Sequence, residues 1–235
     1  MNLFKKCLAE FLGAFLIVFG GCGAILADQV SGGAVGHFGV ATSFGLIVMV
    51  MIYATGHISG AHFNPAVTLS FAATRHFPAR EIIPYVSAQC LGAISASFLH
   101  VLLLAGMVEE GALNLGVTQP RNGVFMTGMI LEFMLTFFLM FVIMAVATDF
   151  RAVGHMAGLA IGGTVWLEAI FAGPLCGASM NPARSLGPVV ASGNWEHFGA
   201  YVLGPVLGAL MGALVYRFLR CDSSDNQNEQ VKGCC

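Results

Sequence analysis

Two stretches of this sequence decide its fold: HISGAHFNPAVT at 57–68 and GASMNPARSLGP at 177–188. Each contains Asn-Pro-Ala. Asparagine is a preferred helix cap, and proline is favoured at the first helical position because its missing N–H is unpaired there anyway. Each stretch therefore predicts a helix start. The apolar segment that follows is only about nine residues long and reaches roughly 13 Å, so it can enter a membrane but cannot cross it.

The rest of the chain has the composition of a membrane protein. Hydrophobic residues make up 57% of the 235 positions, 9% are charged, and the mean hydropathy is +0.82. A span of the hydrocarbon core needs roughly 20 apolar residues. Runs of about that length lie near 7–27, 38–56, 82–106, 124–148, 154–172 and 198–219. We expect an all-α membrane protein with six transmembrane helices and two re-entrant half-helices, which leaves no room for a soluble catalytic domain; the chain is not expected to be an enzyme.

The sequence also repeats itself. Residues of the first run recur at a constant offset of 122, and the two Asn-Pro-Ala stretches are 117 positions apart; the matched residues of the first run are Glu10, Phe11, Phe15 and Phe19, with Glu132, Phe133, Phe137 and Phe141. Three crossings is an odd number, so the second half must enter from the opposite face, as an inverted internal repeat. We expect one channel domain at 1–221, with repeats at about 1–118 and 124–221, and a disordered cytoplasmic tail at 222–235.

The segments before the two helix starts are expected to line a path through the membrane. Non-helical backbone at membrane depth is tolerated only where it is buried in protein or lines a water-filled cavity. The residues expected to present carbonyl groups to this path are Gly60, Ala61 and His62, and Gly177, Ala178, Ser179 and Met180. The N-termini of the half-helices would add positive potential at its centre. Two surface turns are the alternative, which the symmetry of the copies disfavours.

The two stretches resemble the signature loops of the aquaporin, or major intrinsic protein, family. The resemblance covers nearly the whole chain, and AGPLCGASMNPARSLGP at 172–188 is similar to the nodulin-like intrinsic proteins and their microbial relatives. It implies a passive channel for water and small uncharged solutes such as glycerol and metalloid hydroxides, which excludes protons and ions. It also implies a homotetramer with one pore per subunit. No cofactor is expected, and no bound metal, because His57 and His62 are five positions apart and do not share one helix face.

The resemblance assigns roles to particular residues. The paired pore motifs would be Asn64, Pro65 and Ala66, and Asn181, Pro182 and Ala183, with the asparagines donating hydrogen bonds to passing water. The family spacing places a selectivity filter at Phe44, Ala169, Ala178 and Arg184. Water-selective members typically carry histidine where this chain has Ala169, so a wider and less polar filter is implied. Glu10 and Glu132 would accept backbone N–H bonds and support the two loops.

Two charged residues also stand out on physical grounds. An arginine within a membrane segment is costly and is functional by default, which singles out Arg184 without reference to any family. Glu168, beside the filter position, has two open interpretations. It either faces the pore mouth and favours cations and polar solutes, or it pairs with a neighbour and is structural.

Charge sets the orientation and the partners. The basic residues that would lie on one face are Lys5, Lys6, Arg75, Arg80, Arg151, Arg217, Arg220 and Lys232, against Arg121 alone on the other. The positive-inside tendency then predicts a multi-pass protein of the cell membrane with both termini cytoplasmic. The net charge of −2 offers no basic field for nucleic acid, so the expected partners are lipid, water and small neutral solutes.

Two other classes of function remain open from the sequence. A secondary transporter of a small polar solute can also have inverted repeats and broken helices that meet at the membrane midplane. A non-conducting scaffold is the third interpretation, and it leaves the cost of Arg184 without a purpose. Two Gly-x-x-x-Gly patterns, 158–162 and 208–212, are interpreted as helix packing within the bundle.

Overall fold

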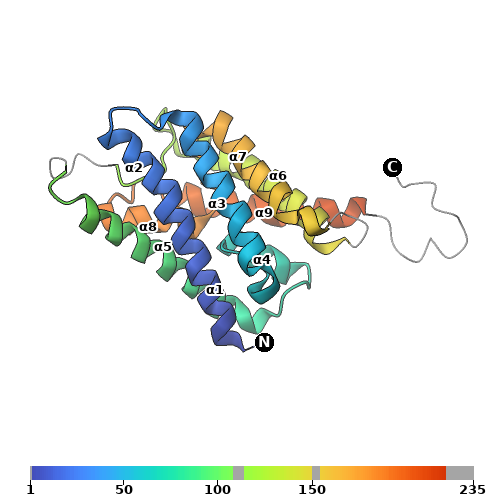
Figure 1. Cartoon of the computed structure of the whole chain (residues 1–235). Coiled ribbons are helices and arrows are strands. Elements are labelled where there is room, and N and C mark those ends of the chain that lie inside the picture. The colour runs from blue at the N-terminus through green and yellow to red at the C-terminus, as the bar shows by residue number, and fades with distance from the viewer. Residues whose placement is uncertain (1, 108–113, 150–153, 221–235) are drawn as a thin grey trace, which may run out of the picture.

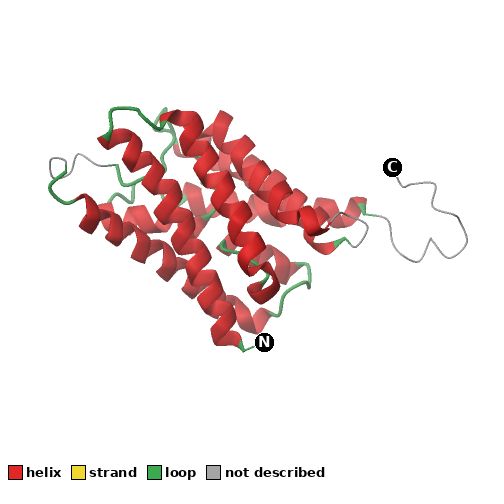
Figure 2. Ribbon diagram, viewed as in Figure 1, coloured by secondary structure: helices red, strands yellow, loops and turns green. Residues whose placement is uncertain are grey.

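The computed structural model describes residues 2–107, 114–149 and 154–220, and they form an all-helical bundle (Figure 2). Six helical spans are long and apolar enough to cross a membrane, as predicted. The first consists of α1 (Leu3–Leu16), a π-helical turn η1 (Ile17–Cys22) and α2 (Gly23–Val30); the others are α3 (Gly36–Ser59), α5 (Ile82–Leu104) after the short turn η2 (Ala79–Glu81), α6 (Phe125–Thr148), α7 (Ala157–Cys176) after η3 (Gly154–Met156), and α9 (Ala200–Leu219). The predicted tail at 222–235 and the predicted position of Arg151 lie outside the described residues.

The two predicted half-helices are present as α4 (Pro65–Ala73) and α8 (Pro182–Ser192). Each begins with proline at its first position, after an asparagine in extended conformation. The Asn64 side chain accepts a hydrogen bond from the Ala66 N–H, and Asn181 accepts from the N–H groups of Ala183 and Arg184. The caps pair helix-end donors that would otherwise be orphaned.

The packing of the helices follows an inverted repeat. In the first half α1 packs against α5, and in the second half α6 packs against α9, while α3 and α7 join the two halves (Figure 1). Each half-helix packs on a long helix of the other half: α4 on α9, and α8 on α5. The halves therefore fold around one another, and each depends on the other to bury its half-helix.

Glycines allow the closest helix contacts. A Cβ added at Gly208 or Gly212 would overlap the carbonyl oxygen of Phe133 or Phe137 on α6, and one at Gly92 would overlap the Phe11 carbonyl on α1. The second Gly-x-x-x-Gly pattern is thus packing within the bundle, as interpreted from the sequence, and so is the first, which packs α7 on α3. Large apolar side chains cover the outer surface, among them Leu46, Leu91, Phe138, Leu167 and Leu207.

We expect Gly208→Ala to destabilise the bundle, because the added methyl group must push the α6 backbone away. Overpacking of a tight core typically costs about 1–3 kcal/mol. Gly163→Ala is the matched control, since a Cβ there meets nothing within 4 Å. Thermal unfolding of the two variants in detergent should show a lower midpoint for Gly208→Ala only; equal midpoints would show that this contact is not tight.

Candidate functional site

The two loops before the half-helices have matching backbone conformations. Gly60, Ala61 and Phe63 have positive φ angles of 88°, 52° and 53°, and their counterparts Gly177, Ala178 and Met180 have 83°, 40° and 55°. Positive φ is uncommon for residues other than glycine, and it persists only where the surrounding structure holds it. The same departure at symmetric positions indicates that both loops are held in a required shape.

Buried carboxylates supply part of that support. Glu132 accepts hydrogen bonds from the backbone N–H groups of Ser179 (2.7 Å) and Met180 (2.6 Å). Glu10 accepts from the N–H groups of His62 (3.0 Å) and Phe63 (2.6 Å). Charge-assisted bonds of this kind are roughly twice as strong as neutral ones. They pair loop N–H groups that would otherwise be unsatisfied inside the membrane. The family resemblance implied this position for both carboxylates.

One tyrosine binds the backbone at the start of each loop, and the sequence did not predict either of them. Tyr85 on α5 donates its hydroxyl hydrogen to the Ser59 carbonyl (2.9 Å), and Tyr201 on α9 donates to the Cys176 carbonyl (2.6 Å). Both side chains are fully buried. Their separation of 116 positions, close to the repeat offset, is the signal in the sequence that would have identified the pair.

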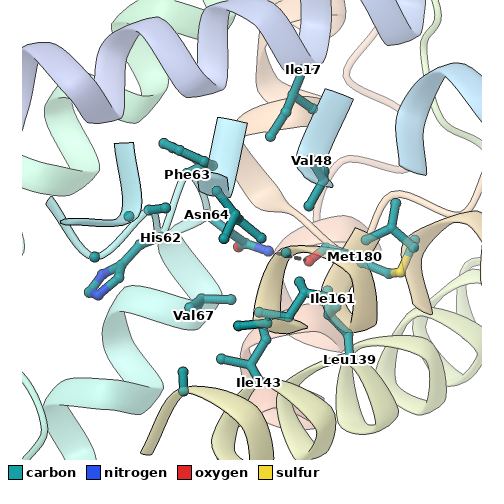
Figure 3. A pocket seen from close by; sticks show the side chains of 18 of the residues that line it. Ile17, Val48, His62, Phe63, Asn64, Val67, Leu139, Ile143, Ile161 and Met180 are labelled. Carbon is teal, nitrogen blue, oxygen red and sulfur yellow. Dashed lines mark hydrogen bonds between the residues drawn. The ribbon is translucent and has the colours of Figure 1, made fainter. Parts of the chain in front are cut away.

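The two asparagines bind the loops to each other. Asn64 Nδ2 donates to the Met180 carbonyl (2.7 Å), the bond drawn in Figure 3, and Asn181 Nδ2 donates to the Phe63 carbonyl (2.9 Å). Each side chain thus uses its oxygen to cap its own half-helix and one amide hydrogen to bind the opposite loop. A primary amide carries two hydrogens, so one on each side chain is left for another acceptor.

A cavity of about 450 Å³ extends from this junction toward the face that carries the N-terminus. Its wall is largely apolar, and Figure 3 shows the side chains around Asn64; they include Ile17, Val48, Val67, Leu139, Ile143 and Ile161. The predicted path residues Gly60, Ala61 and His62, with Ala178, Ser179 and Met180, lie along it. The loop residues therefore add polar groups to a wall that is otherwise largely apolar.

The imidazole ring of His62 points away from Asn64 (Figure 3). It packs against the rings of Phe71 and Phe77, with centroids 4.9 and 4.8 Å away, and its Nδ1 is 3.1 Å from the Thr68 hydroxyl. Its side chain is therefore part of the packing beside the loop.

A second cavity of about 450 Å³ opens toward the other face. Ala169 and Gly177 border this cavity, and Phe44, Ala178 and Arg184 border both cavities. The four predicted filter residues thus all border the second cavity, and three of them, Phe44, Ala178 and Arg184, lie where the two cavities meet. Three of the four come from helices or loops of the second half, and Phe44 comes from α3 of the first.

Arg184 is held at this junction by a few specific contacts. It is 3% exposed, its Nη1 donates to the Gly116 carbonyl (2.6 Å), and its Cζ lies 4.9 Å from the centre of the Phe44 ring. Among the described residues it has no ion-pair partner. No carboxylate of the described residues therefore lies within ion-pair distance of its positive charge.

Glu168 does not lie at the mouth of either cavity, which speaks against the first interpretation offered from the sequence, and the structural interpretation stays a prediction. It is 4% exposed on α7 and does not line either cavity. Its Oε2 is buried, and no hydrogen-bond donor within the described residues reaches it. The same part of the chain contains no group of three or more His, Cys, Asp or Glu side chains placed to hold a metal ion.

These features define a membrane channel: six spans, two half-helices that meet head to head, and two cavities that meet at Phe44, Ala178 and Arg184. Comparisons with known proteins agree. The pattern of the Major intrinsic protein family matches residues 1–216. Aquaporin NIP1-1 of Oryza sativa subsp. japonica is 49% identical over 92% of this chain and 74% of its own length, and Nodulin-26 of Glycine max is 46% identical over 92% and 78%. The chain belongs to the major intrinsic protein family.

A solved structure shows the same fold. The X-ray structure of the aquaglyceroporin from Plasmodium falciparum superposes with a TM-score of 0.80, at 24% sequence identity, over 92% of this chain and 95% of that one. The fold class predicted from the sequence is confirmed.

We expect Glu132→Gln to disturb the second loop. The amide offers one acceptor oxygen where the carboxylate offers two, so one buried N–H group loses its partner at a cost of about 1–3 kcal/mol. Glu168→Gln is the matched control, a change of the same kind at a buried side chain whose Oε2 has no donor. Water permeability of proteoliposomes and thermal stability should fall for Glu132→Gln and stay near wild type for Glu168→Gln; an equal loss in both would contradict this support role.

Proposed function

We propose that this protein is a passive channel for water and small uncharged solutes, among them glycerol and metalloid hydroxides, and that it excludes protons and ions. The observation that carries the proposal is the junction of the two cavities at Phe44, Ala178 and Arg184. It lies beside two half-helix starts fixed at mid-membrane. We assign the channel to residues 1–221, with the segment 222–235 as a tail.

Electrostatics supports the exclusion of protons and cations. Both half-helices point their N-termini at the centre of the path, where their partial positive charges add to one another. Arg184 contributes a full positive charge at the junction. The free amide hydrogens of Asn64 and Asn181 would orient passing water molecules, so that each donates away from the centre and a continuous proton wire is interrupted.

The small filter side chains support a solute range wider than water. Ala169 and Ala178 offer only methyl groups at the junction, so the opening is bounded by the Phe44 ring and the Arg184 guanidinium group. A neutral polyol could hydrogen-bond to the guanidinium group while its carbon chain faces the ring. We assign Phe44, Ala169, Ala178 and Arg184 as the selectivity filter.

Charge supports the orientation. The two faces of the bundle differ in basic residues: the ends of α1, α4, α5 and α9 that share a face carry Lys5, Lys6, Arg75, Arg80, Arg217 and Arg220. Lys6 also forms an ion pair with Glu81 there, at 2.9 Å. By the positive-inside tendency this face is cytoplasmic, with both termini inside. We also propose, from the family resemblance, that the protein is a homotetramer in the cell membrane.

Stopped-flow light scattering on proteoliposomes tests the function. Gradients of an impermeant osmolyte, glycerol, urea and boric acid should each give flux above that of empty liposomes. The flux should rise linearly with the gradient and be indifferent to ion gradients. Saturable flux that depends on an ion gradient would instead favour the transporter, and flux equal to that of empty liposomes would favour the scaffold.

We expect Ala169→His to suppress glycerol and boric acid flux much more than water flux. The imidazole narrows the opening opposite Arg184; water can pass in single file while exchanging hydrogen bonds, whereas a polyol must shed bonds that it cannot replace. Ala169→Ser, which stays small, should keep the wild-type ratio. If Ala169→His reduces water and solute in equal proportion, Ala169 is not a filter residue.

We expect Arg184→Val to keep most of the water flux and to admit protons or small cations, because the fixed charge forms part of the electrostatic barrier. Arg184→Lys keeps a positive charge and should remain tight. A pH-sensitive dye inside the vesicles measures the leak. A correctly folded Arg184→Val protein with no added leak would show that the barrier lies elsewhere.

A further inference from the structure

The first membrane span is not a regular α-helix along its whole length. Between α1 and α2 the chain makes one π-helical turn, Ile17–Cys22. Such turns contain an extra residue, are rare, and occur frequently at functional sites. No pattern in the sequence predicts this turn, and none of the loop or filter residues assigned above belongs to it.

The turn keeps one row of side chains facing inward. Buried residues of the first span recur four positions apart; this row is Glu10, Ala14, Val18, Cys22 and Leu26. In a regular α-helix a row with this spacing drifts by about 40° per step. The extra residue of the π turn counters that drift, so Gly21 and Cys22 face the interior on the same side as Glu10.

Gly21 lies directly against the aromatic ring of Phe44. A Cβ added at Gly21 would overlap the Cδ1, Cε1 and Cζ atoms of that ring. The ring borders both cavities, so it is held between α1–α2 on one side and the opening on the other. Any bulk added at Gly21 must therefore move the ring toward the opening. The neighbouring Gly20 faces a different side chain, Ile47.

A histidine from α5 pairs with the backbone of the turn. The N–H of Gly23, where the regular helix resumes, is shared between the carbonyls of Phe19 and Gly20. His100 Nε2 lies 2.9 Å from the Phe19 carbonyl, and the two rings stack with centroids 5.3 Å apart. A carbonyl can only accept, so Nε2 carries the hydrogen in this bond.

The same turn also contacts Gly116, the residue that accepts a hydrogen bond from Arg184. A Cβ added at Gly116 would lie 2.9 Å from Cys22 Sγ. The carbonyl of Gly116 is the acceptor for Arg184 Nη1. The π turn therefore contacts the ring of one filter residue and the support of another.

We propose that the π-helical turn Ile17–Cys22, held by the hydrogen bond from His100, positions the Phe44 ring and so sets the width of the channel at its junction. His100 and Gly21 are positioning residues, because they act through Phe44 and do not touch the solute. The inference rests on the proposed function, in which Phe44 borders the filter.

The first test compares two neighbouring glycines in proteoliposomes. Gly21→Ala should lower the glycerol-to-water permeability ratio by about tenfold, the discrimination that one methylene of space gives in a fitted site. Gly20→Ala places the same methyl group in the same turn but against Ile47, and it should keep the wild-type ratio. An equal change of the ratio in both variants would overturn the proposal, because a general effect on the turn would then explain it.

The second test asks whether the effect passes through Phe44. Phe44→Leu removes the ring, and in that background Gly21→Ala should have no further effect on the ratio, a strong departure from additivity. Additive effects would contradict the proposal. If the wild type passes no glycerol, the proposed solute range is wrong, but the same comparisons made on water permeability still decide whether Gly21 acts through Phe44.

A third comparison does not depend on Gly21 variants and so holds if they fail to fold. His100→Gln keeps a donor for the Phe19 carbonyl, and His100→Met, of similar length, has none. The ratio should shift in His100→Met and return toward wild type in His100→Gln, with both proteins eluting as wild type does in size-exclusion chromatography. An unshifted ratio in a folded His100→Met protein would overturn the role of the histidine.

Discussion

The structure depends on one pair of interactions: the amide of Asn64 on the Met180 carbonyl and the amide of Asn181 on the Phe63 carbonyl. Two half-helices meet head to head inside a bilayer, where each unsatisfied backbone group costs several kcal/mol. The two bonds join the loops to each other at the junction. Buried side chains behind the loops pair further backbone groups of the loops; these side chains are Glu10, Glu132, Tyr85 and Tyr201. Irregular backbone can therefore remain at mid-membrane, where it lines a passive path for water and small solutes.

The scaffold is symmetric, but the filter is not. Both halves carry Asn-Pro-Ala, a supporting glutamate and a supporting tyrosine at matching positions. The residue after Asn-Pro-Ala differs: Val67 in the first half and Arg184 in the second. The two halves thus support the junction with the same kinds of side chain from both faces. Arg184 adds a positive charge on one side of the junction only. In the function that we propose, this departure from symmetry gives the filter its charge.

Much of the fold could be predicted from the sequence, because apolar length and helix caps are local signals. The six spans and the starts of α4 and α8 agree with the prediction. The π turn at Ile17–Cys22, which packs against α3 and α5, could not be predicted, since its residues have the apolar pattern of an ordinary helix. The hydrogen bonds from the asparagine amides to the opposite loop could not be predicted either, because that loop is more than 110 positions away in the sequence. The burial of Glu168 outside both cavities was also not predictable.

Because the two asparagine bonds fix the junction in one shape, we expect it to be a preformed, passive path. Osmotic water permeability of proteoliposomes, measured as a function of temperature with ion gradients dissipated by ionophores, tests it most directly. We expect a permeability well above that of empty liposomes, a weak temperature dependence typical of a preformed pore, and no effect of ionophores. A steep temperature dependence equal to that of the bare bilayer, or a loss of flux when ion gradients are removed, would contradict it.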